Sequence, residues 1–526
     1  MAKYSVIDKE RKRGDYTLFV EKSIWVIILL LLQVVFIIAT YMLLQEKYLH
    51  LQTILSAISL LVVFFLVNTD MNPSYKLAWC ITILIFPIFG GLLYITLSIN
   101  NTRYQFRKSM REAVLESKTH FTQDTTIMQH LQDIDEDSAL QAQYIYNLAK
   151  YPVYKNGTIS YYSSGEELYI AMLNELEKAT RFIFIEYFII QDGVFWNSVL
   201  DILKQKARDG VEVKVIYDDM GSLRTLPPDY DKELKTYGIE CFCFNPFSPT
   251  LSLRLNNRDH RKIMVIDGHT AFTGGINLAD EYINQRQKLN GYWKDNGIMI
   301  KGEATWNFTV MFLQFWRYLS KEPINYEQYR ATPQILKEHA PTKQEGYIQP
   351  YADNPLFSEI VAENVYLNMI HRATRYIYIT TPYLIVDNEM ITALTLASQS
   401  GVDVRIITPG VPDKKTVFMM TRSFYEPLTK AGVKIYEYTP GFIHSKTVIA
   451  DGQYAVVGSI NLDYRSLYLH FECAAFLYHC KEIEEIKEDI LETISVSKEI
   501  TYESCLQLNK PYRIWQSLLR LYAPLL

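Results

Sequence analysis

The most informative stretch of the sequence reads His260-Arg-Lys-Ile-Met-Val-Ile-Asp267, and a later one, His444-Ser-Lys-Thr-Val-Ile-Ala-Asp451, repeats its pattern. In both, a lysine follows the histidine by two residues and an aspartate follows the lysine by five. The residues between lysine and aspartate are mostly apolar or β-branched, which favours a buried strand. Since side chains two apart on a strand share a face, each histidine and its lysine point into the same space. The repeat therefore predicts two strands, each presenting an imidazole and an ammonium.

The residues after each motif match as well. Asp267 and Asp451 are each followed by glycine, which suits a tight hairpin. A turn role therefore competes with direct participation of these aspartates in chemistry, and the turn role is favoured. At identical offsets follow Gly274-Gly275-Ile276-Asn277 and Gly458-Ser459-Ile460-Asn461. Gly275 and Ser459 let backbone N–H groups approach an anion, and Asn277 and Asn461 add side-chain donors, so the set predicts a phosphate site.

Strands upstream of the motifs are also duplicated. Arg181-Phe-Ile-Phe-Ile-Glu186 resembles Arg375-Tyr-Ile-Tyr-Ile-Thr380, and residues 210–216 resemble residues 401–407. Such strands alternate with helical stretches, which predicts an α/β fold with two duplicated lobes. We expect an N-terminal membrane anchor in residues 1–100, a helical connector in 101–150, the first lobe in 151–330, the second lobe in 331–500 and a C-terminal amphipathic helix in 501–526.

Two imidazoles suit a displacement at phosphorus in which one ring attacks while the other donates a proton to the leaving alkoxide. A carboxylate behind each ring would fix its tautomer, and Asp295 and Glu472 are the candidates, with an exposed acid as the alternative for each. Paired lysines and asparagines can offset the phosphate charge, so we expect no metal, no cofactor and activity in excess chelator.

Three hydrophobic segments near the N-terminus carry no charged residue, namely 23–44, 51–67 and 77–98. A membrane-spanning helix needs about 20 apolar residues, and the first segment is too long for a signal peptide. Basic residues flank the region on both sides, from Lys9 to Arg13 and from Arg103 to Arg111. This predicts cytoplasmic flanks, one segment that does not cross, and a cytoplasmic catalytic region.

The composition is that of a folded protein, with 49% hydrophobic and 21% charged residues among 526. The net charge of −5 gives no global basic field, which weighs against a membrane-tethered nucleic-acid binder. The six cysteines are scattered, which predicts free thiols. Near the C-terminus, apolar residues at helical spacing accompany Arg513 and Arg520, which suggests either an interfacial helix with headgroup contacts or a last helix packed on the body.

At these motifs the chain resembles the phospholipase D superfamily, and within it the bacterial cardiolipin synthases, over nearly all of residues 20–526. Further similar stretches are Tyr217-Asp-Asp-Met-Gly-Ser222, Pro382-Tyr383 and Asn461-Leu-Asp-Tyr-Arg-Ser466. The resemblance implies two lobes that share one active site, with His260 as the nucleophile. The catalytic set that it implies is His260, Lys262, Asp267, His444, Lys446 and Asp451. His470 departs from the family, which usually places Asn before the Phe-Glu pair.

The implied reaction is phosphatidyl transfer between two phosphatidylglycerol molecules, giving cardiolipin and glycerol through a phosphatidyl-histidine. The implied location is a bacterial cell membrane, where a multi-pass protein would meet its bilayer substrate. The same motif is compatible with a hydrolase that releases phosphatidic acid and with transfer to another alcohol, because pocket shape decides between acceptors. Acyl-chain preference and oligomeric state are left open.

Overall fold

The computed structural model describes residues 46–69, 71–86, 90–91, 94, 101–155, 157–246, 256–286, 291–338, 346–357 and 359–525. The chain divides into two compact units. One comprises residues 1–105, 247–255 and 521–526, and the other comprises residues 106–246 and 256–520.

The smaller unit contains helices α2 (Glu46–Val67) and α3 (Pro73–Ile85). Proline at the first position and the Asn72 side chain, which accepts a hydrogen bond from the Ser74 N–H, start α3. A small apolar cluster of Leu66, Trp79, Ile83 and Tyr94 is buried within this unit. Across the described residues, no helix combines the length and apolar character needed to cross a membrane. The hydrophobic segment 23–44 lies outside the described residues, so the membrane anchor stays a prediction.

Helices α5 (Asn101–Ser117), α6 (Thr125–Ile134) and α7 (Glu136–Ala149) lead into the lobes, with the short η1 (Lys118–His120) after α5. Aspartates cap the two later helices: Asp124 accepts from the backbone of α6, and Asp135 accepts from that of α7.

The first lobe is built on a seven-stranded sheet with the order β1-β8-β6-β5-β2-β3-β4. Its strands are β1 (Gly157–Tyr162), β2 (Phe182–Tyr187), β3 (Glu212–Asp218), β4 (Glu240–Phe244), β5 (Lys262–Ile266), β6 (Thr270–Gly274) and β8 (Gly297–Gly302). Its helices are α8 (Gly165–Leu176), α9 (Val194–Arg208), α10 (Asp219–Ser222), α11 (Tyr230–Thr236) and α12 (Thr305–Ser320), with η3 (Asp280–Ile283) and η4 (Tyr326–Tyr329). Strand β2 is buried along its whole length, as its apolar sequence requires at the centre of an α/β sheet.

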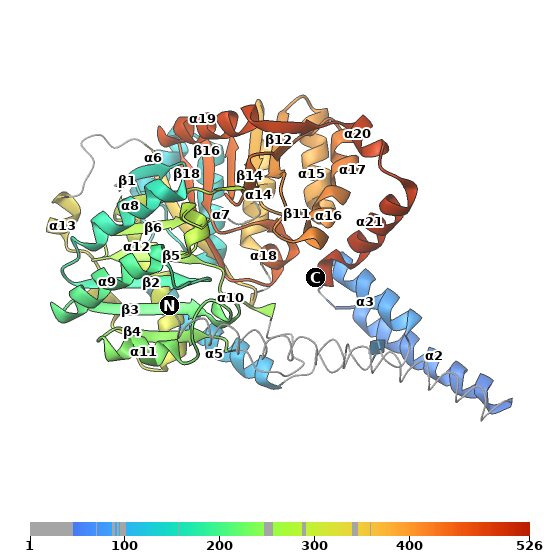
Figure 1. The fold of residues 1–526 in the computed structure, drawn as a ribbon, viewed down its shortest axis with the longest axis horizontal. Coiled ribbons are helices and arrows are strands. Elements are labelled where there is room, and N and C mark those ends of the chain that lie inside the picture. The colour runs from blue at the N-terminus through green and yellow to red at the C-terminus, as the bar shows by residue number, and fades with distance from the viewer. Residues whose placement is uncertain are drawn as a thin grey trace. The chain divides into compact units, whose positions relative to one another are not determined.

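The second lobe, which runs from yellow-orange to red in Figure 1, is built on an eight-stranded sheet with the order β19-β13-β12-β10-β15-β16-β18-β9. Its strands are β9 (Tyr347–Asp353), β10 (Tyr376–Thr380), β12 (Asp403–Pro409), β13 (Lys434–Tyr438), β15 (Thr447–Ala450), β16 (Tyr454–Gly458), β18 (Glu472–Tyr478) and β19 (Ser497–Ile500). Its helices are α14 (Val361–Arg372), α15 (Asn388–Gln399), α16 (Lys415–Ser423), α17 (Tyr425–Lys430), α18 (Tyr464–Tyr468), α19 (Glu482–Ser495) and α20 (Tyr502–Leu506), preceded by α13 (Pro333–Glu338). With β19 set aside, this order repeats that of the first sheet strand for strand, which confirms the duplicated α/β fold.

Backbone pairings join the lobes, among them the isolated bridge between Tyr154 and Ile348. Strand β7 (Tyr292–Lys294) of the first lobe runs parallel to β14 (Gly441–Ile443) of the second. Asp259, next to His260, forms an isolated bridge with Phe471, next to Glu472. A further short pair, β11 (Leu384–Ile385) with β17 (Leu462–Asp463), lies within the second lobe.

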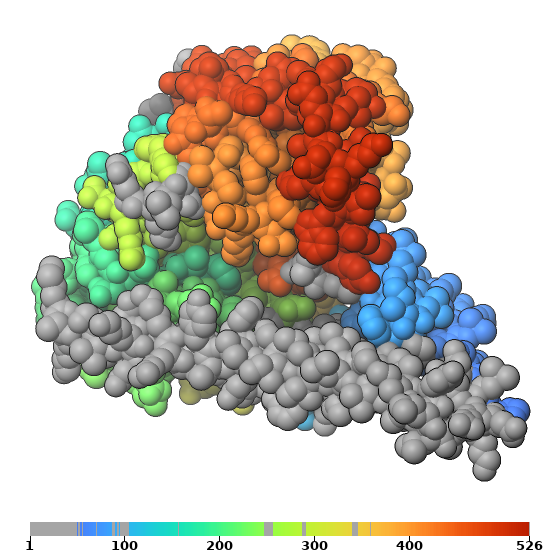
Figure 2. All heavy atoms as spheres, turned by 45° about the vertical axis from the view of Figure 1, so that its right-hand side comes forward, coloured from blue at the N-terminus to red at the C-terminus, as the bar shows by residue number. Residues whose placement is uncertain are grey.

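Helix α21 (Lys510–Tyr522) packs on the second lobe, where Figure 2 shows its red spheres along the orange surface. Arg513 forms an ion pair with Glu426 at 2.8 Å, and Arg520 donates to the Ser423 carbonyl at 3.3 Å. These two arginines therefore contact protein, as the alternative of a last helix packed on the body predicts. Apolar side chains stay exposed on the same helix, including Trp515 at 51%.

Candidate active site

The ring of His260 is held by a carboxylate from the second lobe. Its Nδ1 lies 2.9 Å from Oε1 and 3.0 Å from Oε2 of Glu472, the first residue of β18. The hydroxyl of Ser466 donates to Oε1 at 2.7 Å, and that of Ser459 donates to Oε2. An ionised carboxylate only accepts hydrogen bonds, so Nδ1 of His260 carries the proton and Nε2 keeps its lone pair.

The ring of His444 is held by a carboxylate from the first lobe. Its Nδ1 lies 2.7 Å from Oδ2 of Asp295, which follows β7. Gly275 leaves the space for this carboxylate, because a Cβ at that position would collide with Asp295 Oδ1. The matching position in the second lobe is Ser459, which instead donates to Glu472.

Backbone pairing explains why the carboxylates cross between lobes. The His260 N–H donates to the Phe471 carbonyl at 2.9 Å, and the Phe471 N–H donates to the Arg258 carbonyl at 2.8 Å. In the other half, the His444 N–H donates to the Lys294 carbonyl at 2.7 Å. Each histidine is thus fixed beside the residue that precedes the opposite lobe's carboxylate. The structure therefore brings His260, His444, Asp295 and Glu472 into one buried group.

The two motif lysines are buried beside the histidines. Lys262 Nζ donates to the His260 carbonyl at 2.6 Å, whereas Lys446 Nζ contacts the His444 carbonyl and lies 2.8 Å from its Nδ1. Burial lowers the pKa of Lys262 to about 8 and that of Lys446 to about 7. Both amines can therefore change charge near neutral pH unless an anion holds their protons.

The pKa of both imidazoles is lowered in the free protein, which favours their neutral forms. Burial, followed by the charges of Lys262, Lys446 and His444, places the pKa of His260 well below its usual value. Burial and Lys446 lower the pKa of His444 to about 4, although Asp295 opposes the shift. A bound phosphodiester anion would raise both values, because it stabilises the protonated rings.

Asp267 and Asp451 lie at the far ends of their strands from the histidines. Asp267 accepts from the N–H groups of Thr180, Arg181 and Phe182 at 2.8–2.9 Å, and from the Thr180 hydroxyl at 2.9 Å. Asp451 accepts from the matching groups of Thr374, Arg375 and Tyr376 at 2.7–2.9 Å. Both have positive φ, near 53° and 54°, as their hairpin turns require. These contacts tie each hairpin to the neighbouring strand, as the favoured turn role predicts, and the catalytic role that the resemblance implies for both aspartates stays a prediction.

The two asparagines expected at the phosphate site differ. Asn277 uses both polar groups within the protein, because its Oδ1 accepts from the Ile189 N–H at 3.2 Å and its Nδ2 donates to the Tyr282 hydroxyl at 2.7 Å. Asn461 is also buried, but its Oδ1 has no hydrogen-bond partner among the described residues. Asn277 therefore positions Tyr282, and Asn461 is the better candidate for a contact with a bound molecule.

Aromatic rings to which the sequence motifs gave no role surround the two histidines. Phe188 packs edge-on against His260 with ring centroids 5.0 Å apart, and Tyr282 does so against His444 at 5.3 Å. Trp293 lies 5.7 Å from His444 and Phe442 lies 6.0 Å away. Ser466 was missed as well, although it falls within the Asn461 to Ser466 stretch that carried the resemblance. Such residues come into contact only through the fold, so sequence spacing could not single them out.

His470, at the position that departs from the family pattern, lies beside His260 and Glu472. The rings of His470 and His260 are 5.5 Å apart, and His470 Nδ1 is 3.7 Å from Glu472 Oε1. One ligand atom from each of these three residues lies within 4.8 Å of the others, so the group could hold a metal ion. The sequence shows no such cluster, because its members come from opposite lobes.

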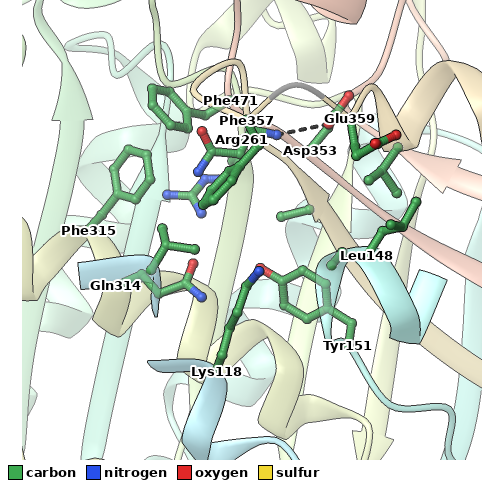
Figure 3. A pocket seen from close by; sticks show the side chains of 15 residues that line it. Lys118, Leu148, Tyr151, Arg261, Gln314, Phe315, Asp353, Phe357, Glu359 and Phe471 are labelled. Atoms are coloured by element: carbon green, nitrogen blue, oxygen red, sulfur yellow. Dashed lines mark hydrogen bonds between the residues drawn. The ribbon is translucent and has the colours of Figure 1, made fainter. Parts of the chain in front are cut away.

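Figure 3 shows a separate pocket, which has a volume of about 110 Å³. Its lining includes Arg261, which alternates with His260 and Lys262 along the chain, together with Lys118, Tyr151 and Gln314. Arg261 forms ion pairs with Glu186 and Asp259 there. Phe471, whose carbonyl accepts from the His260 N–H, also lines this pocket, whereas His260, His444, Asp295 and Glu472 do not.

Comparison with known proteins agrees with this geometry. The family described as cardiolipin synthase, PLD-like domain, matches residues 172–316 and 366–494, one copy in each lobe. The chain belongs to this family. A phospholipase D-nuclease N-terminal family matches residues 54–98.

Among relatives, cardiolipin synthase from Geobacillus kaustophilus is 35% identical over 92% of this chain and 95% of its own. Cardiolipin synthase 2 from Bacillus cereus is 35% identical over 88% of this chain and 89% of its own. An uncharacterized protein from Streptococcus mutans is 44% identical over 88% of this chain and 99% of its own. The crystal structure of a phosphatidylserine synthase from Haemophilus influenzae has a TM-score of 0.56, 16% identity, and coverage of 73% of this chain and 99% of that one. This last likeness supports the shared fold of the cardiolipin synthase, PLD-like domain.

Proposed function

We propose that the protein is a cardiolipin synthase that transfers a phosphatidyl group from one phosphatidylglycerol to another and releases glycerol. One observation carries the proposal: two buried histidines, each oriented by a carboxylate of the opposite lobe, lie in a single site. Membership of the cardiolipin synthase, PLD-like domain family and full-length relatives of that name support the choice of substrate.

In the first step, the Nε2 lone pair of His260 attacks the phosphorus of one phosphatidylglycerol. The P–N bond forms, the P–O bond to glycerol breaks, and protonated His444 gives its proton to the departing oxygen. His260 takes the nucleophilic role because both oxygens of Glu472 face its Nδ1 proton, which leaves the Nε2 lone pair for phosphorus. The lysines offset the charge on the phosphoryl oxygens.

In the second step, neutral His444 takes the proton from a glycerol hydroxyl of a second phosphatidylglycerol. That oxygen attacks phosphorus, the P–N bond breaks, and the electron pair returns to His260 Nε2. Cardiolipin forms, and His444 is protonated again for the next cycle. One phosphodiester replaces another, so no nucleotide is consumed.

The proposal places the protein at a bacterial membrane through its N-terminal hydrophobic segments, with the lobes on the cytoplasmic side. Support comes from the uncharged segments, from the match of residues 54–98 to an N-terminal family, and from exposed apolar side chains on α2 such as Phe64 and Phe65. A reporter fused after Leu526 should be active only inside the cell. Activity confined to the outside would reject the orientation.

The decisive experiment gives detergent-purified protein phosphatidylglycerol alone, with excess chelator. Mass spectrometry of the lipids and an assay for glycerol should find cardiolipin and glycerol in equal amounts, and a His260→Ala variant should form neither. Phosphatidic acid in place of cardiolipin would show that water is the acceptor and that the protein is a hydrolase.

A further inference from the structure

We propose that His260, His470 and Glu472 form a binding site for Zn²⁺ or a similar transition metal ion, and that a metal bound there stops the reaction. The binding stands on geometry alone, whereas its inhibitory effect rests on the proposed role of His260. The site would make this protein sensitive to metal although its chemistry uses none.

The three side chains form a ligand set typical of zinc, namely two imidazoles and one carboxylate. With metal–ligand bonds of about 2.0–2.2 Å, neighbouring ligand atoms of a tetrahedral site lie roughly 3.3 Å apart. Glu472 Oε1 lies 2.9 Å from His260 Nδ1 and 3.7 Å from His470 Nδ1, so the observed separations lie on either side of that value. Two of the three separations are therefore close to that of a tetrahedral site, and all three ligand atoms lie within 4.8 Å of one another.

His470 lies in this group with a nitrogen that nothing else uses. Its Nδ1 is buried and has no hydrogen-bond partner among the described residues, and it is the atom that faces Glu472. A buried polar atom without a partner costs free energy, which a metal ion would recover.

A metal bound at His260 Nδ1 would prevent the attack on phosphorus, because it would move the single proton of the neutral ring to Nε2. In the metal-free protein this proton is on Nδ1 and points to Glu472, which leaves the Nε2 lone pair for phosphorus. A metal occupies the Nδ1 lone pair, so the proton moves to Nε2 and the nucleophilic pair is lost. The ring keeps one proton throughout, and no oxidation or reduction takes place.

Two features limit the affinity. Glu472 already accepts hydrogen bonds from Ser459 and Ser466, and the charge of Lys262 acts on the same carboxylate and ring. We therefore expect weaker binding than at a dedicated structural zinc site. His444 has no equivalent group in the described part of the chain, because the rings of Tyr282, Trp293 and Phe442 surround it.

The test uses full-length protein in detergent and compares the wild type with His470→Asn. Co²⁺ is the probe, since its visible absorption reports tetrahedral coordination, and Zn²⁺ is added to displace it. The wild type should show the band and lose cardiolipin formation as Zn²⁺ is added. In His470→Asn the band should disappear, and the Zn²⁺ concentration for half inhibition should rise about 10-fold or more.

His371→Asn is the matched control, because His371 is exposed at the end of α14, away from the group. It should bind Co²⁺ and respond to Zn²⁺ as the wild type does. Equal Co²⁺ spectra and equal Zn²⁺ sensitivity in wild type and His470→Asn would overturn the proposal. If no form of the protein made cardiolipin, the Co²⁺ spectra would still decide the site, and His470→Gln provides a second substitution should His470→Asn fail to fold.

Discussion

The two lobes present the same histidine and lysine from equivalent strands, but they hold their histidines differently. His260 meets both oxygens of Glu472, and two serine hydroxyls hold that carboxylate in place. His444 meets one oxygen of Asp295, and Lys446 Nζ lies 2.8 Å from the same nitrogen. The first ring is therefore locked in one tautomer, as a nucleophile requires, whereas the second has competing partners, which suits a group that exchanges protons.

The crossing of carboxylates also means that neither lobe is complete. An isolated first lobe would leave His260 without Glu472, and an isolated second lobe would leave His444 without Asp295. The duplication therefore yields one active site between the lobes rather than one site in each. The difference between the histidines can be tested step by step.

The largest expected effect comes from removing one histidine at a time. His260→Ala and His444→Ala should each lower cardiolipin formation by at least about 10⁴-fold, because the two rings act as a unit. The two variants should differ in the covalent intermediate that accumulates on the protein. With radiolabelled phosphatidylglycerol, denatured His444→Ala should retain a phosphatidyl adduct on His260, and denatured His260→Ala should carry no label. Label only in His260→Ala would reverse the assignment of the two lobes.

A variant of each carboxylate should behave like the variant of the histidine that it contacts in the opposite lobe. Glu472→Gln should lower the rate about 10³-fold and form little adduct, because His260 loses its tautomer control. Asp295→Asn should also slow turnover but should accumulate adduct, as His444→Ala does. Rapid-quench measurement of adduct and product separates the two cases.

The same two variants can also contradict the crossed pairing, because Asp295 lies in the lobe of His260 and Glu472 lies in the lobe of His444. If Asp295→Asn abolished the adduct while Glu472→Gln accumulated it, the carboxylates would act within lobes and the crossed pairing would be rejected. Correct folding of both variants is checked by thermal unfolding, since loss of a buried carboxylate also affects stability.

The duplicated fold was predictable because the sequence carries it locally. Strands such as residues 181–186 and 375–380 are short apolar runs, and the two histidine motifs repeat with identical spacing. Asp295 and Glu472 could also be named as orienting acids, since each follows a short aromatic-containing stretch near its motif. Their assignment to particular histidines could not be made, because it depends on the β7–β14 pairing and the Asp259–Phe471 bridge between lobes.

Contacts between residues far apart in the sequence were harder to predict. The group of His260, His470 and Glu472 exists only after the lobes meet, and the rings around His444 come from both lobes. For Arg513 and Arg520 the sequence left headgroup contacts and a packed last helix as alternatives, and in the structure their charges contact Glu426 and the Ser423 carbonyl. Periodicity identified the helix but not the face that packs.

A smaller effect should appear in the pH dependence of kcat/KM, which should distinguish Lys446 from Lys262. Burial lowers the pKa of Lys446 to about 7 and that of Lys262 to about 8. Each ammonium is present below its pKa and lost above it, so kcat/KM for free enzyme should fall as pH rises through 7 to 8. Lys446→Arg keeps its positive charge, so the decline of its kcat/KM should begin near pH 8. At pH 8, kcat/KM as a fraction of its maximum should be about tenfold higher for Lys446→Arg than for the wild type, which loses the charge of Lys446. Lys262→Arg should leave the decline near pH 7, and identical profiles in both variants would contradict the ordering.

The smallest effect on turnover should come from the aspartates that end the motif strands. Asp267→Asn and Asp451→Asn replace an oxygen acceptor by an amide donor that faces backbone N–H groups, at a cost of roughly 1–3 kcal/mol of folding free energy. Thermal unfolding should occur a few degrees lower for each, while kcat of the folded protein should stay within about twofold. His260→Ala provides the contrast, since it should remove activity with a smaller change in unfolding temperature. A loss of kcat in either aspartate variant comparable to that of Glu472→Gln would show that these residues take part in the reaction, since a hairpin tie at the far end of the strand cannot act on the phosphate.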